Sequence, residues 1–312
     1  MDLGVQIEPQ FGFSYADVLG IAREAETAAF RALWVSDHLF LGADAVATDC
    51  LEAWTLLAAL AVDTKKIRIG PMVTSQSYRN PALLAKIAAG VDHMSGGRRE
   101  FGLGAGWKEV EYRAYGYEFP DAPTRVTQLV ETLEICTRLW SEPKATYRGK
   151  HYRIEDAVSS PKPLQKPLQI WIGGTKPRVM RIAAKFAQWF NLSNPGQPAE
   201  PRIAEMNKEL PVACKAVGRD LDTLKRSLFI QVLVAPTRRE IDEIAGELGA
   251  RTKTSGAEWL KARPAMIVGT PDEVGGKLRA VAAGGIDHAN VMFPYKFEMV
   301  GVKAMREIAR AL

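Results

Sequence analysis

The chain has 312 residues, 47% of them hydrophobic, which is enough for one large closed core or two smaller ones. Its formal net charge of +5 comes from 41 basic and 36 acidic residues without a Lys/Arg block, which argues against nucleic-acid binding and suits either an ordinary mixed surface or a preference for small anionic ligands. Three widely spaced cysteines suggest neither a disulfide framework nor a zinc site. No apolar run approaches the roughly 18 residues that cross a bilayer, and no secretion signal is visible, so we expect a soluble, cytoplasmic protein.

Short apolar strands alternate with amphipathic helices along nearly the whole chain. Strands are predicted at residues 3–7, 32–36, 67–73, 99–104, 168–172, 188–192, 227–234 and 287–292. Helices are predicted at residues 15–30, 51–63, 81–94, 125–140, 177–186, 199–217, 238–248, 271–283 and 298–311. Repeats of this kind favour a closed (β/α)₈ TIM barrel over an open doubly wound sheet, and we expect residues 1–312 to form a single α/β domain.

Two helix starts carry clear capping signals. Asn80 before Pro81 is typical of an N-cap followed by proline at the first helical position. Thr270 before Pro271, with Glu273 at the third helical position, repeats the signal as a capping box. These residues fix where helices begin and say nothing about substrate.

Two insertions depart from a minimal barrel. Residues 145–155 alternate around Gly149 and predict a surface hairpin before the fifth strand. Residues 250–264 form a second insertion, before the last pair of helices. Such insertions build lids or subunit contacts, or they only decorate the surface.

The second predicted strand leads into Asp37 and His38. Functional side chains of a barrel gather where its strands end, and a histidine beside a carboxylate there can donate a hydrogen bond or move a proton near neutral pH. The alternative is a structural histidine tied to its own loop. Asp-His pairs recur at residues 92–93 and 287–288, so only the position of His38 at the expected catalytic face distinguishes it.

Small residues follow the fourth predicted strand. Gly104, Ala105 and Gly106 begin like a dinucleotide fingerprint, but Glu109 occupies the position of the third glycine, so a Rossmann site is not indicated. The small side chains of this segment would let a flat ring or a phosphate approach the backbone, and Trp107 could pack over an aromatic ligand. A tight loop capped by a core tryptophan is the alternative.

The fifth predicted strand runs through Gly173 and Gly174 into a helix start that contains Thr175, Lys176 and Arg178. Exposed N–H groups at a helix N-terminus favour negative charge, and these three side chains add donors. The segment therefore predicts a phosphate site more strongly than a plain strand–helix turn. It is not a Walker loop, and the sequence shows no motif for metal binding or for a serine hydrolase.

Several segments resemble the luciferase-like monooxygenase superfamily: SDHLF, then RIGPMVTSQSYRNPALLAKIAAGVDHMSGGR and GLGAGWKEVEYRAYGYEFP, and finally HYRIEDAVSSPKPLQKPLQIWIGGTKPRVMRIAAKFAQWFN. Within it the chain is most similar to the branch that depends on the deazaflavin F420. The resemblance covers nearly the whole chain, is strongest over residues 33–191 and thins after Ser193. It implies a barrel whose mouth holds a flavin-like ring, with the cofactor phosphate near the end of the fifth strand.

The resemblance also implies roles for individual residues. Asp37 and His38 would lie beside the reactive ring, and a non-prolyl cis peptide is expected between Met72 and Val73. Catalytic candidates are His38, Asp37 and Glu8, with Gln10 as a polar anchor. Cofactor contacts are expected from Met72, Val73, Thr74, Ala105, Gly106, Trp107, Gly173, Gly174 and Thr175. Lys176 and Arg178 depart from the neutral turn of many relatives, and we expect these two cations to bind the cofactor through its phosphate or the polyglutamate tail of F420.

Three functions follow from the resemblance. The first is an F420-dependent oxidoreductase that moves a hydride between the cofactor and a small organic substrate, with His38 in the proton role. The second is an FMN-dependent monooxygenase that uses O₂ and reduced flavin from a partner reductase. The third is a flavin-binding barrel without catalysis. All three stay open, because fold similarity alone does not distinguish them. A homodimer is expected by analogy.

Overall fold

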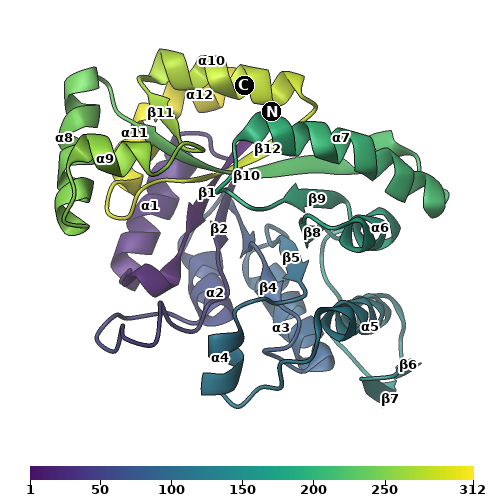
Figure 1. Cartoon of the computed structure of the whole chain (residues 1–312). Helices are drawn as coiled ribbons and strands as arrows, with labels where there is room; N and C mark the ends of the chain where they lie inside the picture. Colours follow the sequence, from purple (N-terminus) through teal and green to yellow (C-terminus); the bar gives the residue numbers. More distant parts are fainter.

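The computed structural model describes residues 1–312 and has the predicted (β/α)₈ barrel architecture, with helices surrounding a central sheet (Figure 1). Each predicted strand is confirmed, the third one in two pieces, β3 and β4. The main sheet contains β1 (Asp2–Ile7), β2 (Ala32–Val35), β3 (Arg68–Pro71), β4 (Thr74–Ser75), β5 (Phe101–Gly104), β8 (Ile170–Gly174), β9 (Trp189–Leu192), β10 (Lys225–Val234) and β12 (His288–Met292).

The sheet closes on itself through the interrupted third strand. Its order is β3-β2-β1-β12-β10-β9-β8-β5-β4, and neighbouring strands are parallel. Only Met72 and Val73 separate β3 from β4, so both ends of this path belong to one stretch of chain. A bridge from Ile69 to Arg99 also joins β3 to the residues that lead into β5. The carboxyl ends of all strands therefore share one rim, which we call the mouth.

Helices cover the outside of the barrel. They are α1 (Tyr15–Thr27), α2 (Ala53–Asp63), α3 (Pro81–Met94), α5 (Ala122–Ser141), α6 (Pro177–Phe186), α7 (Ala199–Ala216), α8 (Arg238–Arg251) and α10 (Pro271–Ala283). The predicted caps are confirmed: Asn80 Oδ1 accepts from the N–H of Ala82 at 2.9 Å, and Thr270 forms a capping box with Glu273. The start predicted for α5 was too late, because Asp121 caps the helix and accepts from the N–H of Thr124 at 2.9 Å.

Other short elements differ from the sequence prediction. The single helix predicted at residues 298–311 is two helices, α11 (Glu298–Ala304) and α12 (Arg306–Ala311), which meet at Met305 with φ −90° and ψ 3°. The helices α4 (Glu109–Ala114) and α9 (Gly256–Lys261), the strand β11 (Ile267–Gly269), and the 3₁₀ turns η1 (Pro9–Phe11) and η2 (Leu221–Thr223) were not predicted. Elements of three to six residues are too short to show a hydrophobic period.

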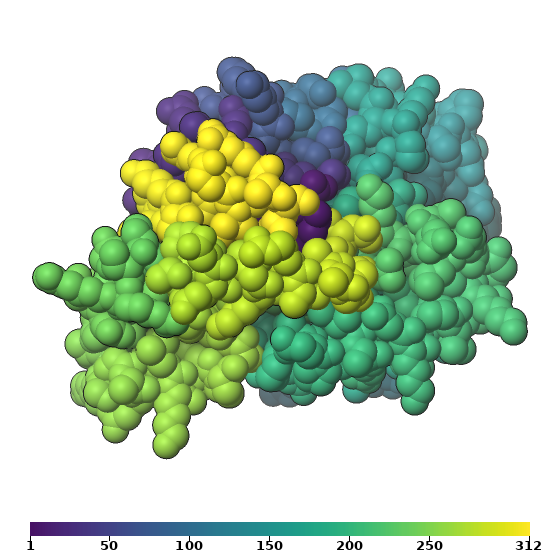
Figure 2. All heavy atoms as spheres, turned by 90° about the horizontal axis from the view of Figure 1, so that it is seen from above, coloured from purple at the N-terminus to yellow at the C-terminus, as the bar shows by residue number.

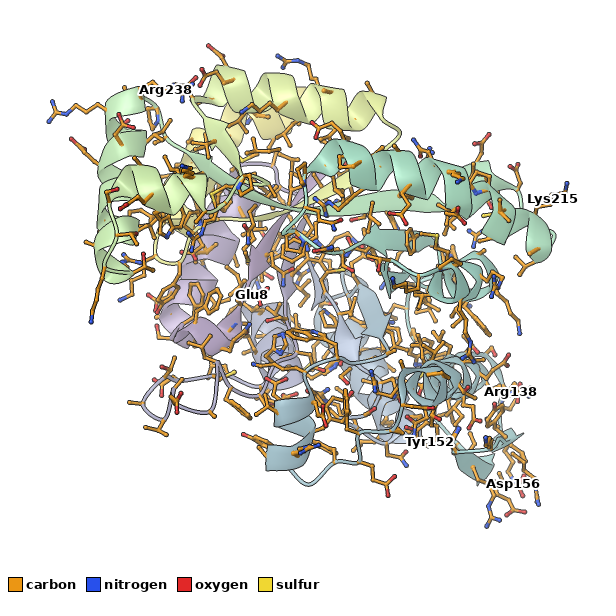
Figure 3. All side chains as sticks on the ribbon, viewed as in Figure 1. Glu8, Arg138, Tyr152, Asp156, Lys215 and Arg238 are labelled. Atoms are coloured by element: carbon orange, nitrogen blue, oxygen red, sulfur yellow. The ribbon has the colours of Figure 1, made fainter.

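Both predicted insertions are present. The strands β6 (Ala145–Arg148) and β7 (Arg153–Ala157) form the expected antiparallel hairpin, and Figure 3 shows Asp156 at the edge of the molecule. The Glu131 carboxylate of α5 holds the turn by accepting from the N–H of Lys150 at 2.8 Å and of Tyr152 at 2.8 Å. Residues of the second insertion form the end of α8, α9 and the connection to β11, which pairs with β10.

The protein has one main core and two smaller apolar clusters. The main core contains 65 buried residues between the barrel and its helices. A second cluster, which we call the small core, joins the end of β10 to α8 and α9. It consists of Leu233, Ala235, Ile241, Ile244, Ala245, Leu248 and Trp259.

A third cluster fills the barrel interior below the mouth. Trp171 and Trp189 stack with ring centres 4.1 Å apart, and Trp34 meets Trp171 edge-on at 4.6 Å. The Nε1–H of Trp34 donates to Nε2 of His288 at 3.1 Å, and complete burial lowers the pKa of His288 to about 3. Neutral His288 is therefore part of a packed aromatic plug that fills this part of the barrel interior.

The two ends of the chain meet on one face. Figure 2 shows the yellow C-terminal residues packed beside the purple N-terminal ones, and the amino group of Met1 donates to the carbonyl of Leu312 at 2.8 Å. No helix combines the length and the apolar composition that crossing a bilayer needs.

Candidate functional site

Asp37 is held at the mouth by four hydrogen bonds. Its carboxylate accepts two hydrogen bonds from the Arg79 guanidinium, at 2.7 and 2.9 Å, and others from Thr74 Oγ1 at 2.5 Å and the N–H of Ser75 at 3.0 Å. Asp37 is 5% exposed, and Arg79 also pairs with Glu52. With its lone pairs engaged in this way, the carboxylate ties the end of β2 to β4 and has little capacity left for a substrate.

His38 lies next to it and is fixed by a residue that sequence reasoning missed. Its Nδ1 is 2.9 Å from Oε2 of Glu111, which is fully buried on α4. Glu111 also accepts from the N–H of Leu39 at 2.9 Å, the Tyr78 hydroxyl at 2.8 Å and the Lys108 ammonium at 3.1 Å. The hydrogen bonds of this carboxylate define the orientation of the imidazole ring.

The charge of Glu111 decides which nitrogen of His38 is available. Burial by itself would raise the pKa of the Glu111 carboxyl, but the hydrogen bond and charge of His38, with further donors, lower it to about 2. The ionised carboxylate can only accept, so Nδ1 of His38 carries the proton in the contact. Its Nε2 makes no hydrogen bond within the protein and is available to a proton donor or acceptor.

The segment after β5 forms the wall next to His38. Gly106 has φ +77°, and a Cβ there would come within 1.8 Å of the Tyr112 hydroxyl, so both backbone and space require glycine. Ala105 is partly buried, whereas Trp107 is 72% exposed and meets His38 edge-on with ring centres 5.6 Å apart. A core-capping role for Trp107 is therefore wrong, and an exposed indole of this kind is available to an aromatic ligand.

The peptide bond between Met72 and Val73 is cis, as expected. Met72 packs in the aromatic plug, while Val73 lies against neighbouring strands. A Cβ at Gly104 would come within 2.6 Å of the Val73 side chain, and one at Gly173 within 3.2 Å. These glycines therefore make room for Val73. Thr74, fully buried, accepts from the Trp54 indole at 3.1 Å, so its hydroxyl is committed to the protein.

A polar pocket lies where β8 and β9 end. Gly173 and Gly174 complete β8, and Lys176 is the N-cap of α6 without a side-chain capping bond. The pocket has a volume of about 150 Å³, and its polar lining residues are Thr175, Lys176, Asn194, Gln197, Arg202 and Glu205. Two cations, one acid and neutral donors suit an anionic group with a phosphate or carboxylate.

Arg178 is not directed to this pocket. Its guanidinium donates to the carbonyl of Pro123 at 3.0 Å and to Thr127 Oγ1 at 2.9 Å, which ties the start of α6 to α5. The structure thus separates the two cations that the sequence placed together. Lys176 lines the pocket, and Arg178 makes helix-to-helix contacts.

Glu8 lies near the middle of the molecule, at the end of β1 (Figure 3). Its carboxylate accepts from Gln6 Nε2 at 2.8 Å and from Gln10 Nε2 at 2.6 Å. Gln10 in turn accepts from the Ser36 hydroxyl at 2.8 Å, and Gln6 accepts from Asn290 at 2.8 Å. These side chains form a polar floor beside His38, in which Glu8 is the only ionisable member.

Comparisons with known proteins find a matching family profile and similar enzymes. The profile described as luciferase-like monooxygenase matches residues 1–288. An F420-dependent glucose-6-phosphate dehydrogenase of Microbacterium testaceum is 30% identical over 230 residues, which cover 73% of this chain and 66% of the relative. An FMNH₂-dependent dimethylsulfone monooxygenase of Pseudomonas putida is 22% identical over 261 residues, covering 76% and 72%.

The fold is shared with solved structures. An F420-dependent secondary alcohol dehydrogenase in complex with an F420-acetone adduct superposes with a TM-score of 0.80 at 20% identity, covering 98% of both chains. The chain spans about two thirds of the length of several curated relatives that it matches.

Proposed function

Because the chain belongs to the luciferase-like monooxygenase family, we propose that it is an oxidoreductase that uses the deazaflavin F420 to move a hydride to or from a small organic substrate. The observation that carries the proposal is the pair of His38 and Glu111 at the mouth, with Nε2 of His38 unpaired. The F420-dependent dehydrogenase among the matched relatives supports this choice of cofactor.

The residues at the mouth fit such a cofactor in two places. Trp107, Ala105 and Val73 offer an apolar seat for a flat ring, since Trp107 is 72% exposed beside His38. The pocket at the start of α6 offers Lys176 and Thr175 to an anionic arm. When bound, the deazaflavin supplies two-electron hydride transfer.

The protein itself contributes the group that carries a proton during the reaction. Nε2 of His38 accepts or returns the proton that accompanies hydride transfer at the substrate, and Glu111 holds the ring and stabilises its charged form. Asp37 maintains the geometry through Arg79 and Thr74. Glu8 is the alternative proton carrier, since its carboxylate belongs to the polar floor next to His38.

The second candidate is an FMN-dependent monooxygenase on the same barrel, supported by the FMNH₂-dependent relative. It would need O₂ and reduced flavin from a partner reductase. The third is a barrel that binds a flavin without catalysis. All three use the same seat, so the bound cofactor and its reactivity distinguish them.

The deciding experiment is an absorbance titration of the purified chain with F420 and with FMN, followed by stopped-flow mixing of the reduced complexes with O₂ or organic acceptors. We expect tighter binding of F420 and slow reaction with O₂. Tighter binding of FMN with rapid oxidation by O₂ would replace the proposal by the monooxygenase. A reduced complex that reacts with neither O₂ nor any acceptor would favour the barrel without catalysis.

A substitution at His38 tests the proposed proton role directly. His38→Ala should keep cofactor affinity within about twofold and lose turnover by roughly 100-fold or more, because general acid–base catalysis contributes on this scale. Undiminished turnover would move the proton role to Glu8, Asp37 or solvent.

A further inference from the structure

A second cavity opens at the mouth, on the side of β10 and β12. It has a volume of about 310 Å³, and we call it the rim pocket. Gln231 and Met292 line it and are register partners, and Met292 is also the register partner of Gln6 in the polar floor. Phe11, three residues after Glu8, forms part of its wall. The rim pocket therefore lies beside the polar floor, where β12 pairs with β1.

The lining of the rim pocket is mainly apolar and aromatic. Phe11, Trp259 and Tyr295 contribute rings, and Met292 contributes a flexible side chain. Tyr295 is fixed by edge contacts with Phe11 at 5.9 Å and with Phe13 at 4.9 Å between ring centres. A volume near the lower end of the roughly 300–1,000 Å³ of ligand pockets, walled by rings, suits a small body with an aromatic or compact apolar part.

Two arginines line the same cavity, and they differ in their partners. Arg251 is satisfied, because it donates to Glu247 at 2.5 Å and to the carbonyl of Tyr295 at 2.9 Å. Arg263 has no carboxylate partner. Its guanidinium stacks 3.9 Å above the Trp259 ring and donates once, to the carbonyl of Trp259 at 3.0 Å. The remaining N–H groups of Arg263 form a donor edge for which the protein provides no anion.

We propose that the rim pocket binds a small organic acid with an aromatic body, whose carboxylate pairs with Arg263 and whose ring lies among Phe11, Trp259 and Tyr295. The inference rests on the proposed function in one respect: it makes such an acid the substrate class of the redox site at the same mouth. The positive charge of Arg263, its unpaired N–H groups and the aromatic walls of the rim pocket each favour an aromatic acid over sugars and over neutral alcohols.

Binding can be measured without any cofactor, which keeps this proposal separate from the proposed function. Isothermal titration calorimetry of the full chain with 3-phenylpropanoate and with its neutral amide should show at least about tenfold tighter binding of the acid, since a hydrogen bond to a charged group contributes on this scale. Arg263→Gln should remove that preference, and Arg263→Lys should retain part of it. Arg239→Gln, an exposed variant on α8, should leave the affinity unchanged.

Each other outcome has a defined meaning. Equal affinity for acid and amide, no binding of the acid at millimolar concentration, or an Arg263→Gln variant that still prefers the acid would overturn the proposal. A cooperative thermal unfolding transition in each of the three variants is the control that they are folded. Failure of F420 and FMN to bind, with acid binding intact, would instead overturn the proposed redox function alone.

Discussion

Nδ1 of His38 lies 2.9 Å from the Glu111 carboxylate, so a buried acid on α4 orients a histidine at the end of β2. Because this acid is ionised, it engages Nδ1, which leaves Nε2 without a protein partner, and it stabilises a charged imidazole. The same carboxylate accepts hydrogen bonds from the backbone N–H of Leu39 and from the Tyr78 hydroxyl. The site therefore depends on Glu111, which belongs neither to the apolar seat proposed for the ring nor to the pocket proposed for the anionic arm.

Glu111→Gln should lower kcat by roughly 100-fold or more while the KM for cofactor changes little, because the charge that stabilises the protonated ring is lost. Steady-state kinetics with varied cofactor at a saturating concentration of substrate measures both constants. Glu111→Asp should recover part of kcat, which a purely structural role would not predict. Glu118→Gln, an exposed variant, is the matched control. An unchanged kcat in Glu111→Gln would remove the carboxylate from the mechanism.

Lys176→Ala should weaken cofactor binding and reduce its dependence on salt, because Lys176 lines the pocket proposed for the anionic arm. Arg178→Ala should change affinity less than about twofold, because its guanidinium is engaged with α5. Titrations at low and high salt test both variants. Equal effects of the two substitutions would show that Arg178 also reaches the cofactor.

Asp37→Asn should reduce the free energy of unfolding by about 3 kcal/mol, because it leaves the buried Arg79 guanidinium without its two-point partner. Urea denaturation gives this value. Glu155→Gln breaks the exposed ion pair with Arg148 and should cost less than about 1 kcal/mol. A loss as small as that of the surface variant would show that Asp37 does not fix the rim.

Gly102→Ala should destabilise the barrel by about 2 kcal/mol or more, since the added Cβ would lie 2.0 Å from the carbonyl oxygen of Pro71. Gly90→Ala lies within α3, where nothing is within 4 Å of the new atom, and should stabilise by about 0.5–1 kcal/mol. Thermal unfolding compares the two. Opposite signs are expected, and a neutral Gly102→Ala would mean that the strands separate easily.

His288 should contribute to loss of stability in acid. Its folded pKa of about 3 lies below the unfolded value of 6.5, so its contribution is present above pH 6.5 and is lost as pH falls toward 3. His288→Gln should therefore lose about 2 kcal/mol less than the wild type between pH 7 and pH 4.5, measured by urea denaturation.

The barrel strands could be predicted because parallel strands buried on both faces appear as short apolar runs, and the long helices because they carry a clear period. Glu111 could not be predicted in the same way. It is separated from His38 by 73 residues in the chain, and locally it resembles Glu109, which makes only an exposed pair with Arg113. Its function arises from where α4 packs, and α4 is too short to be visible in the sequence.

The predicted cofactor residues illustrate a second limit. Thr175, Lys176 and Arg178 look equivalent as donors at a helix start. Their direction depends on side-chain contacts with α5, which the sequence does not encode locally. The cis peptide at Met72 was expected from the resemblance alone, whereas the glycines that accommodate Val73 are explained only by the assembled strands.

The small core has a kinetic consequence for the rim pocket. Leu248 and Trp259 belong to both, while most of the barrel is held by the separate main core. A segment with few buried side chains of its own opens at a lower free energy than the whole domain. We therefore expect residues 238–261 to open locally while the barrel remains folded, and the residence time of a molecule in the rim pocket to follow the rate of this opening.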